Sequence, residues 1–327
     1  MRMISAPTAW ARRFAPLPTL LIAAALASVA HAQDYPNRFI RAIVGPGPDI
    51  VARLFGPKVS EALGQQMVIE QRPGAGGVIA AQSVAAAAPD GYTLLQATAS
   101  YTINTALQTS PLDLGRDFVP VGLLSTTPFV LVVHPSVPAK NLAELIAYAK
   151  ANPGKLNYAS SGIGTPPHLA GELFKSMAGV DIVHVPYREA NSALNAVVAG
   201  TTDMMFSIAS TAQSQIDGGT VRGLGVTARE PSPLLPGVPS IAQSGLPGFE
   251  VIGWNGFVAP RGTPLSVVAT LSAALQVGLD DAELRKKLTA AGYQAAGRNT
   301  PEQFGGFIRS DTAKWVELVA RTNMKGN

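Results

Sequence analysis

From Phe39 onward, the chain alternates short runs of β-branched residues with longer stretches in which apolar residues recur at helical spacing. The run Phe39–Val44 predicts a strand. The apolar residues between Ile50 and Leu63 predict a helix, which Asp49 can cap and Gly64 can end. Because strands that alternate with helices usually lie parallel, in a sheet covered on both faces, this pattern predicts an α/β fold.

The alternation continues almost to the C-terminus. Further strands are expected at 67–70, 92–96, 130–133, 156–159, 182–185 and 203–208, and further helices after Gly77, at 141–152, at 166–178, from Asn191, at 263–279 and at 301–322. The proline-rich segment 231–247 predicts a long ordered loop. This order of elements indicates two α/β lobes, the second inserted in the first, with 33–130 and 254–327 in lobe 1 and 131–253 in lobe 2.

Residues 1–32 have the pattern of a secretory signal peptide. Arg2, Arg12 and Arg13 provide a positive region, Leu17–Val29 is an apolar run, and Ala30-His31-Ala32 is a small-x-small cleavage site. The apolar run is too short for a membrane anchor, and no later stretch is apolar over a membrane-spanning length. We therefore expect an exported chain whose mature form lies in the periplasm without a membrane span.

Charge and cysteine content exclude several classes of protein. The formal net charge is +4, but the leader holds three of the 25 basic residues, which leaves 22 basic against 21 acidic residues in the rest of the chain. Nucleic acid is not an expected partner, because its affinity depends on clustered Lys and Arg, and no such cluster occurs. The absence of cysteine excludes disulfides, thiolate metal sites, iron–sulfur clusters and cysteine nucleophiles.

Motifs for cofactors and catalysis are incomplete or missing. Gly45-Pro46-Gly47 follows a strand, but Ile50 stands where the third glycine of a dinucleotide fingerprint belongs. The phosphate-binding loop, GxSxG and HExxH patterns do not occur. His134, His168 and His184 have no metal-ligand spacing, so buried or capping roles are expected for them. The sequence therefore predicts no cofactor, no metal and no catalytic residue.

Three turns rich in Gly, Ser, Thr and other small residues follow strands and precede helices: Gly45–Pro48, Ala97–Tyr101 and Ser160–Thr165. Helix N-termini carry unpaired N–H groups and partial positive charge, and small side chains let a ligand approach these amides. In open α/β sheets such junctions converge at the carboxyl ends of the strands. Any one of them could be merely a tight turn, but the three together predict an anion-binding cleft.

Several segments at and near these turns carry motifs of a known family. They are Arg72–Gly77 (RPGAGG), Ala88–Leu95 (APDGYTLL), Lys155–Phe174 (KLNYASSGIGTPPHLAGELF), Val185–Tyr187 (VPY), Leu246–Glu250 (LPGFE) and Ala259–Pro264 (APRGTP). Through them the chain resembles, from about Tyr35 onward, the Bug-type periplasmic solute-binding proteins of tripartite tricarboxylate transport systems. The resemblance implies a two-lobed periplasmic-binding-protein fold (type II, Venus flytrap), with a mixed sheet in each lobe, that closes on a small carboxylate.

The resemblance also implies which residues bind the ligand. The family holds the carboxylate mainly through backbone amides, hydroxyls and ordered waters from loops of both lobes. Carried over to this chain, the ligand-binding residues are Gly45, Pro46 and Gly47 in the first loop, Ala99 and Ser100 in the second, Ser161, Gly162 and Thr165 in the third, and Tyr187 and Asp203 on the inner face of lobe 2. For Asp203, a capping role in a helix or loop is the alternative.

The chain departs from the family pattern at two positions. The first loop is shorter before Asp49 than is usual, which puts the contacts of Gly45–Gly47 in doubt and leaves room for a bulkier, even aromatic, ligand. After Val-Pro-Tyr, the segment Arg188-Glu189-Ala190-Asn191 replaces the usual Lys-Gly-Ser-like run. Arg188 is either a solvated surface charge or a partner for the distal carboxylate of a dicarboxylic ligand.

These observations predict a solute-binding protein and not an enzyme. The expected ligand is a small organic carboxylate, which includes di- and tricarboxylates, amino acids and aromatic acids. The expected partners are the permease subunits of a tripartite tricarboxylate transporter, with the binding protein itself a monomer. A ligand-presenting component of a two-component sensor and a secreted α/β hydrolase are the alternatives, although no activated nucleophile with a matching base is identifiable.

Overall fold

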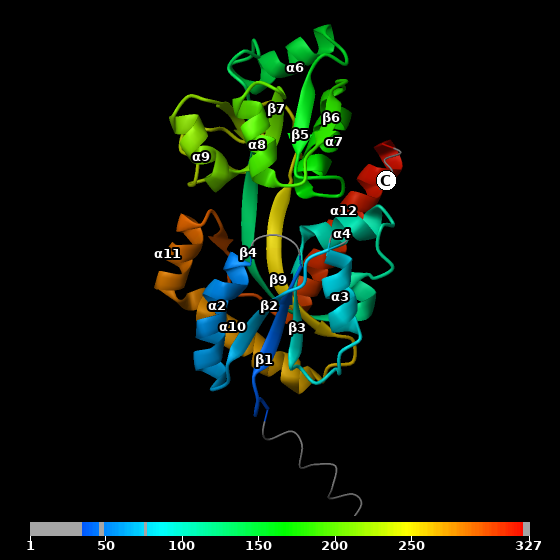
Figure 1. Ribbon diagram of the computed structural model, residues 1–327, viewed down its shortest axis with the longest axis vertical. Helices are drawn as coiled ribbons and strands as arrows, with labels where there is room; N and C mark the ends of the chain where they lie inside the picture. Colours follow the sequence, from blue (N-terminus) through cyan, green and yellow to red (C-terminus); the bar gives the residue numbers. More distant parts are fainter. Residues whose placement is uncertain (1–34, 46–48, 75–76, 323–327) are drawn as a thin grey trace, which may run out of the picture.

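The computed structural model describes residues 35–45, 49–74 and 77–322. These residues form two lobes, one above the other in Figure 1, with two long strands running between them. The alternation of strands and helices predicted from the sequence is confirmed. The predicted signal peptide, together with Pro46 and Gly47 of the first loop, lies outside the described residues.

The strands follow one hydrogen-bonded path, in the order β2-β1-β3-β9-β4-β7-β5-β6, with β8 and β10 also paired to β4. Lobe 1 holds β1 (Ile40–Val44), β2 (Met67–Gln71), β3 (Thr93–Thr98), β9 (Ile252–Pro260) and β10 (Gln294–Ala295). Lobe 2 holds β5 (Asn157–Ser160), β6 (Val183–Pro186), β7 (Met204–Ile208) and β8 (Arg222–Val226). The longest strand, β4 (Phe118–Val133), belongs to both lobes.

Helices cover both halves of this sheet (Figure 1). In lobe 1 they are α2 (Ile50–Leu63), α3 (Val78–Ala85), α4 (Ala99–Ala106), α5 (Leu114–Asp117), α10 (Leu265–Asp280), α11 (Ala282–Ala290) and α12 (Pro301–Thr322). In lobe 2 they are α6 (Leu142–Ala151), α7 (Pro166–Ala178), α8 (Ala190–Val198) and α9 (Ala209–Asp217).

The sheet is mixed in each lobe, as the family resemblance implied, and not wholly parallel, as the alternation alone predicted. In lobe 1, β1 lies parallel to β2 and β3, whereas β9 is antiparallel to β3. In lobe 2, β5 lies parallel to β6 and β7, whereas β4 is antiparallel to β7 and β8. The antiparallel pairings arise because β9 enters lobe 1, and β4 enters lobe 2, from the junction between the lobes, whereas β3 and β7 run toward that junction.

Strand β4 changes partner where it passes from one lobe to the other. Residues 118–128 pair with β9, and residues 129–133 pair with β7 in lobe 2. Helix α12 also joins the lobes, because Trp315 and Leu318 are buried in the same hydrophobic cluster as Leu169 and Phe174 of α7. The prediction placed all of 254–327 in lobe 1, whereas the last turns of α12 pack against lobe 2.

Several capping signals in the sequence have the expected geometry, but the prediction that Asp49 caps α2 is wrong, because its side chain makes no capping hydrogen bond and pairs with Arg53 at 2.6 Å instead. Gly64 and Gly179 end α2 and α7 in the left-handed region, with φ of 66° and 62°. Asn141 caps α6 by accepting a hydrogen bond from the N–H of Glu144, at 2.9 Å. Such caps satisfy backbone groups that a helix end leaves unpaired, so they fix where each helix begins and ends.

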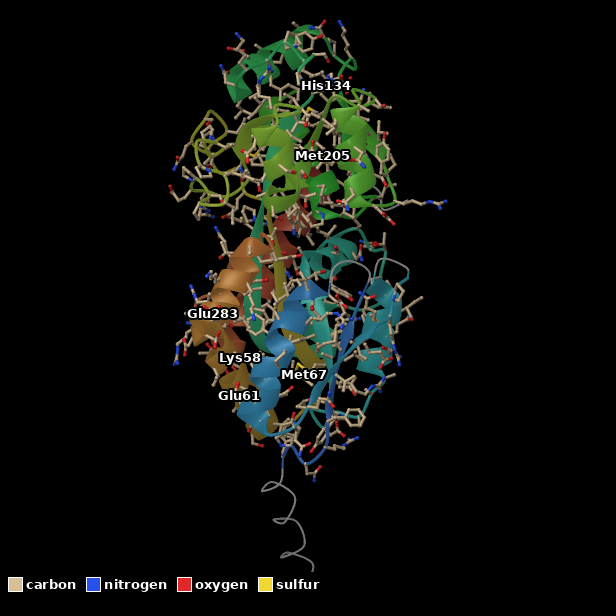
Figure 2. The ribbon with its side chains drawn as sticks, turned by 60° about the vertical axis from the view of Figure 1, so that its left-hand side comes forward. Lys58, Glu61, Met67, His134, Met205 and Glu283 are labelled. Carbon is tan, nitrogen blue, oxygen red and sulfur yellow. The ribbon has the colours of Figure 1, made fainter. Side chains whose placement is uncertain are left out.

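The outer face of lobe 1 carries charged side chains, including Lys58 and Glu61 of α2 and Glu283 of α11 (Figure 2). Lys58 joins these two helices through an ion pair with Asp281, at 2.7 Å. Across residues 35–45, 49–74 and 77–322, no single helix is long and apolar enough to cross a membrane; α10 and α11 meet that test only as a pair, bent by 74°.

Candidate functional site

A cavity of about 950 Å³ lies between the two lobes. Lobe 1 contributes Ala99 and Ser100 to its lining, lobe 2 contributes Ser161 and Thr165, and β4, which joins the lobes, contributes Thr127. The cavity therefore lies where a single ligand can touch both lobes, at the junctions that the sequence pointed to.

The beginnings of four helices line this cavity. Ala99–Tyr101 open α4, Pro166 and Pro167 open α7, Ala190 and Asn191 open α8, and Thr211 lies in the first turn of α9. Each helix start contributes partial positive charge, which favours an anion between the lobes. The convergence arises because α4, α7 and α9 follow β3, β5 and β7 at their carboxyl ends, where open α/β sheets bind ligands.

Six of the predicted site residues line this cavity. Lining the cavity are Gly45, Ala99, Ser100, Ser161, Thr165 and Arg188. Gly162, Tyr187 and Asp203 are not among its lining residues, and Pro46 and Gly47 lie outside the described residues.

Asp203 has a structural role at the other end of lobe 2. Its carboxylate accepts a hydrogen bond from the N–H of Asn157 at 2.8 Å, and its carbonyl accepts one from the N–H of His134, also at 2.8 Å. Figure 2 shows His134 farther from lobe 1 than Met205, which lines the cavity. The structure therefore places Asp203 at the amino end of β7, as a loop cap, and not on the inner face of lobe 2.

The third loop, Ser160–Thr165, is held by hydrogen bonds within lobe 2. The N–H of Gly162 donates to Ser160 Oγ at 3.1 Å, and the N–H of Gly164 donates to His168 Nδ1 at 3.3 Å. The Thr165 hydroxyl donates to the carbonyl of Gly162 at 2.6 Å. These glycine amides already have partners, so they are not the unpaired donors that the sequence predicted.

Helix α7 also offers fewer amide donors than a typical helix start. It opens with Pro166 and Pro167, neither of which has an N–H group. This loop contributes Ser161, Ile163, Gly164 and Thr165 to the cavity lining, together with the partial charge of the helix end. The internal bonds hold the loop in one shape, so these side chains are pre-positioned.

The second loop leads into α4, which several contacts fix against lobe 1. The Tyr101 hydroxyl donates to the carbonyl of Gly77 at 3.3 Å, and burial raises the pKa of Tyr101, so this donor stays protonated. The Thr102 hydroxyl donates to the buried carboxylate of Asp311 on α12, at 2.7 Å. Ser100, in the first turn of α4, is thereby held at the cavity wall.

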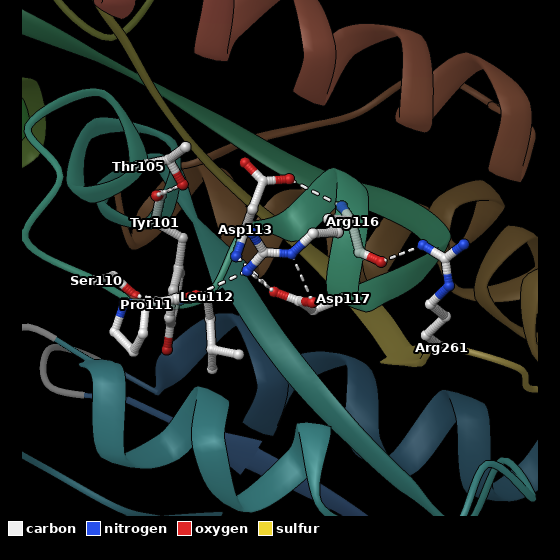
Figure 3. A network of polar contacts seen from close by, with 9 residues as sticks. All are labelled: Tyr101, Thr105, Ser110, Pro111, Leu112, Asp113, Arg116, Asp117 and Arg261. Carbon is white, nitrogen blue, oxygen red and sulfur yellow. Dashed lines mark hydrogen bonds and ion pairs between the residues drawn. The ribbon is translucent and has the colours of Figure 1, made fainter.

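A polar network holds the segment after α4 (Figure 3). The Arg116 guanidinium donates to the carbonyl of Pro111 and pairs with the Asp117 carboxylate, each at 2.7 Å. Its hydrogen bond to Asp117 is the main reason that the pKa of this carboxyl lies below its usual value. Asp113 caps the short helix α5 by accepting from the N–H of Arg116, at 2.8 Å. The network anchors α4 from its C-terminal side.

Two oppositely charged residues of the described chain line the cavity, Arg188 and Glu189. Both are exposed and stand at the start of α8. Arg188 makes no hydrogen bond or ion pair with the described residues, so its guanidinium is available to an anion. The other lining residues that the structure describes are neutral, which fits a ligand held by hydrogen bonds more than by several ion pairs.

Sequence reasoning missed the residues at the floor of the cavity. Gln96 on β3, Thr127 on β4, and Trp254 and Asn255 on β9 all line it. The sequence signal for such residues is a polar residue at a buried position of a largely apolar strand, as Gln96 is within Thr93–Thr98. A polar side chain in such a position needs a hydrogen-bond partner. The sequence did not show which strands would be neighbours, so these residues could not be grouped.

A buried cluster of aromatic and titratable side chains lies behind the third loop. The imidazole of His184 stacks between the rings of Tyr158 and His168, with centroids 4.8 and 4.2 Å away. Its Nε2 is 2.7 Å from Ser160 Oγ. Burial, followed by the nearby His168, lowers the pKa of His184 to about 4, and burial also lowers the pKa of His168. Both rings are therefore neutral near pH 7, as expected for buried histidines.

This serine–histidine pair lacks the features of a catalytic pair. Ser160 is fully buried and does not line the cavity, and no carboxylate of the described residues is hydrogen-bonded to His184. A nucleophilic serine must reach its substrate, and its base needs an orienting partner. Among the described residues, no group of three or more His, Asp or Glu side chains is placed to hold a metal ion.

Two α/β lobes joined by paired strands, with a largely neutral cavity between them, define a two-lobed solute-binding protein. The chain matches the tripartite tricarboxylate transporter family receptor over residues 51–324 and belongs to that family. It is therefore a periplasmic solute-binding protein of the Bug type, a class that captures solutes and does not transform them.

Three similar proteins illustrate the relationship. BugT of Bordetella pertussis is 31% identical over 325 residues, which are 96% of this chain and 98% of BugT. The structure of R. palustris Rpa4515 with adipate superimposes with a TM-score of 0.79 at 32% identity, covering 89% of this chain and 99% of that one. MatC from Rhodopseudomonas palustris, with bound malate, gives 0.76 at 34% identity, covering 87% and 100%.

Proposed function

We propose that this protein binds a small organic carboxylate in the cavity between its lobes and delivers it to the permease subunits of a tripartite tricarboxylate transporter. The observation that carries the proposal is the cavity itself, which four helix starts and the residues Ser100, Ser161 and Thr165 line. Two relatives of the same fold hold the dicarboxylates adipate and malate, which supports a ligand of this class.

In this proposal, the ligand stabilises a closed arrangement of the lobes. Contacts from Ser100 in lobe 1 and Ser161 in lobe 2 to one ligand favour the state in which both reach it. The hinge is the segment where β4 and β9 pass between the lobes, close to Pro128 and Ile252. Lobe 2 then comprises roughly residues 131–253, and the functional unit is a monomer.

Arg188 has a defined part in this scheme. Its guanidinium at the cavity wall, which has no partner among the described residues, binds the distal carboxylate of a dicarboxylic ligand. Hydrogen bonds to charged groups contribute about 1.5–3 kcal/mol, so Arg188→Ala weakens dicarboxylate binding by roughly 10- to 100-fold. Binding of a monocarboxylate of similar length changes little.

The test is calorimetric titration of the purified mature protein with mono-, di- and tricarboxylates and aromatic acids. Arg38→Ala is the matched control, because Arg38 pairs with Asp90 on the exterior of lobe 1 and does not line the cavity. If no acid binds, carboxylate capture is wrong. If Arg188→Ala and Arg38→Ala leave dicarboxylate affinity equally unchanged, the role of Arg188 is wrong.

Delivery to a permease is a separate part of the proposal. Deletion of the gene for this protein should abolish uptake of the bound acid, and only the intact exported chain should restore it. Loss of a transcriptional response with uptake intact would favour the sensor alternative. Export by cleavage after Ala32 is checked by the mass of the periplasmic protein, which should begin at Gln33.

A further inference from the structure

The floor of the cavity is a row of polar side chains across three neighbouring strands. Gln96 on β3 donates from Nε2 to Asn255 Oδ1 on β9, at 2.9 Å. Asn255 in turn donates from Nδ2 to Ser125 Oγ on β4, at 3.3 Å. Thr127 lies two residues beyond Ser125 on the same strand and therefore on the same face.

Two oxygen atoms in this row have no hydrogen-bond partner in the described protein. They are Gln96 Oε1 and Thr127 Oγ1. Gln96 is 1% exposed and Thr127 is 4% exposed, and both side chains line the cavity. A buried polar atom without a hydrogen bond is costly, so each one needs an explanation, and beside a cavity a ligand can supply the missing partner.

The hydrogen bonds of this row leave the side-chain oxygen of Gln96 without a partner. Its amide nitrogen is engaged with Asn255 Oδ1, and the Asn255 nitrogen is engaged with Ser125, so the free atom of Gln96 is the oxygen. An ionised carboxylate only accepts hydrogen bonds and cannot satisfy this oxygen. The complementary group on a ligand is a donor, which means a hydroxyl or an ammonium group.

The charge around the floor favours the neutral donor. An ammonium group needs a nearby carboxylate, and Glu189, the carboxylate among the described lining residues, is exposed at the start of α8. Asp311, close to Trp254, already accepts from Thr102 and Trp254 and pairs with Lys314. A hydroxyl can donate to Gln96 Oε1 and share a second hydrogen bond with the Thr127 hydroxyl, with no charge to neutralise.

We propose that Gln96 and Thr127 select carboxylates that carry a hydroxyl group on their carbon chain over the same acids without it. This inference rests on the proposed function and adds a specificity-determining pair to it. A site built to hydrogen-bond a ligand hydroxyl discriminates strongly against the analogue that lacks it, because the buried polar atoms are then left unpaired.

The experiment compares matched acids by calorimetry on the wild-type protein: succinate with malate, and glutarate with 2-hydroxyglutarate. We expect the hydroxylated member of at least one pair to bind roughly 10-fold or more tightly. Gln96→Met should reduce this preference to less than about threefold by weakening the hydroxylated acids more than succinate and glutarate, and Thr127→Val should reduce it in part.

Two control variants remove the same kinds of atom elsewhere. Gln213 and Thr202 also carry a buried oxygen without a partner in the described protein, but neither lines the cavity. Gln213→Met and Thr202→Val should leave the preference unchanged. Equal binding of both members of each pair by the wild-type protein would overturn the inference, and so would tighter binding of aspartate than of malate. Binding of no carboxylate at all would instead overturn the proposed function.

Discussion

The carboxylate of Asp311 links three elements around the cavity, and its removal is a sharp test of that role. Asp311 lies on α12 and is 6% exposed. Its Oδ2 accepts from the Thr102 hydroxyl on α4 at 2.7 Å and from Trp254 Nε1 on β9 at 2.9 Å, while Oδ1 pairs with Lys314 at 3.0 Å. The side chain thus ties α12 to the two elements that carry Ser100 and Trp254.

Asp311→Ala leaves the Thr102 and Trp254 donors buried without an acceptor. Hydrogen bonds to a charged group contribute about 1.5–3 kcal/mol each, and breaking a buried charged pair typically costs about 3–5 kcal/mol. We therefore expect Asp311→Ala to lower the free energy of unfolding by about 3–5 kcal/mol. Asp311→Asn keeps one acceptor oxygen for both donors and loses mainly the charge, so its cost is about 1–2 kcal/mol.

Urea unfolding followed by tryptophan fluorescence measures this difference, because Trp254 and Trp315 are both buried in the fold. Asp280→Asn is the control, since Asp280 pairs with Arg298 on the exposed surface, where ion pairs contribute less than about 1 kcal/mol. An Asp311→Ala variant as stable as the control would refute the claim that this carboxylate holds α4, β9 and α12 together.

Two further expectations concern the core and the histidine cluster. A β-carbon at Gly171 would collide with the Tyr158 ring, so Gly171→Ala should lower the free energy of unfolding by about 1–3 kcal/mol or more. Gly179 has a φ of 62° and open space around it, so Gly179→Ala should cost only about 1 kcal/mol. Equal melting temperatures for the two variants would contradict this. Because the folded pKa of His184 is about 4, below the unfolded value of about 6.5, the unfolded state binds protons first as pH falls, and stability should decline from about pH 6.5 to 4. A pH–stability curve for His184→Gln should be flatter over that range, and an unchanged slope would show that His184 is not responsible.

Much of the fold follows from local signals. Pro166 at the start of α7 and Gly179 at its end mark that helix in the sequence, because proline suits the first turn and glycine tolerates the left-handed conformation. The same reasoning located α2, α6 and α12. Such signals act within a few residues, so they can be read without knowing the tertiary structure.

The sequence predicted only the last four residues of β4, because residues that disfavour strands occupy its first part. Pro120, Gly122 and Pro128 interrupt its first part and are typical strand breakers. The sheet accommodates Pro120 and Gly122 with a shift in register between them, and a second shift follows between Leu123 and Ser125. These bulges depend on β9, a partner far away in the sequence, so local propensity could not predict the strand.

The candidate site divides in the same way. Ser100, Ser161 and Thr165 could be predicted because strand-to-helix junctions meet at one edge of an α/β sheet. The sequence could not show that the N–H groups of Gly162 and Gly164 are unavailable to a ligand, because they donate to the side chains of Ser160 and His168. The row from Gln96 to Ser125 depends on the neighbouring positions of β3, β9 and β4 and is visible only in the folded chain.

A crystal structure of the mature protein with a tightly binding dicarboxylate tests the central claim most directly. The account predicts the acid between the lobes, with one carboxylate within hydrogen-bond distance of Ser100 or the first turn of α4 and with contacts from Ser161, Thr165 or Arg188 of lobe 2. An acid bound elsewhere, or touching one lobe alone, would contradict it.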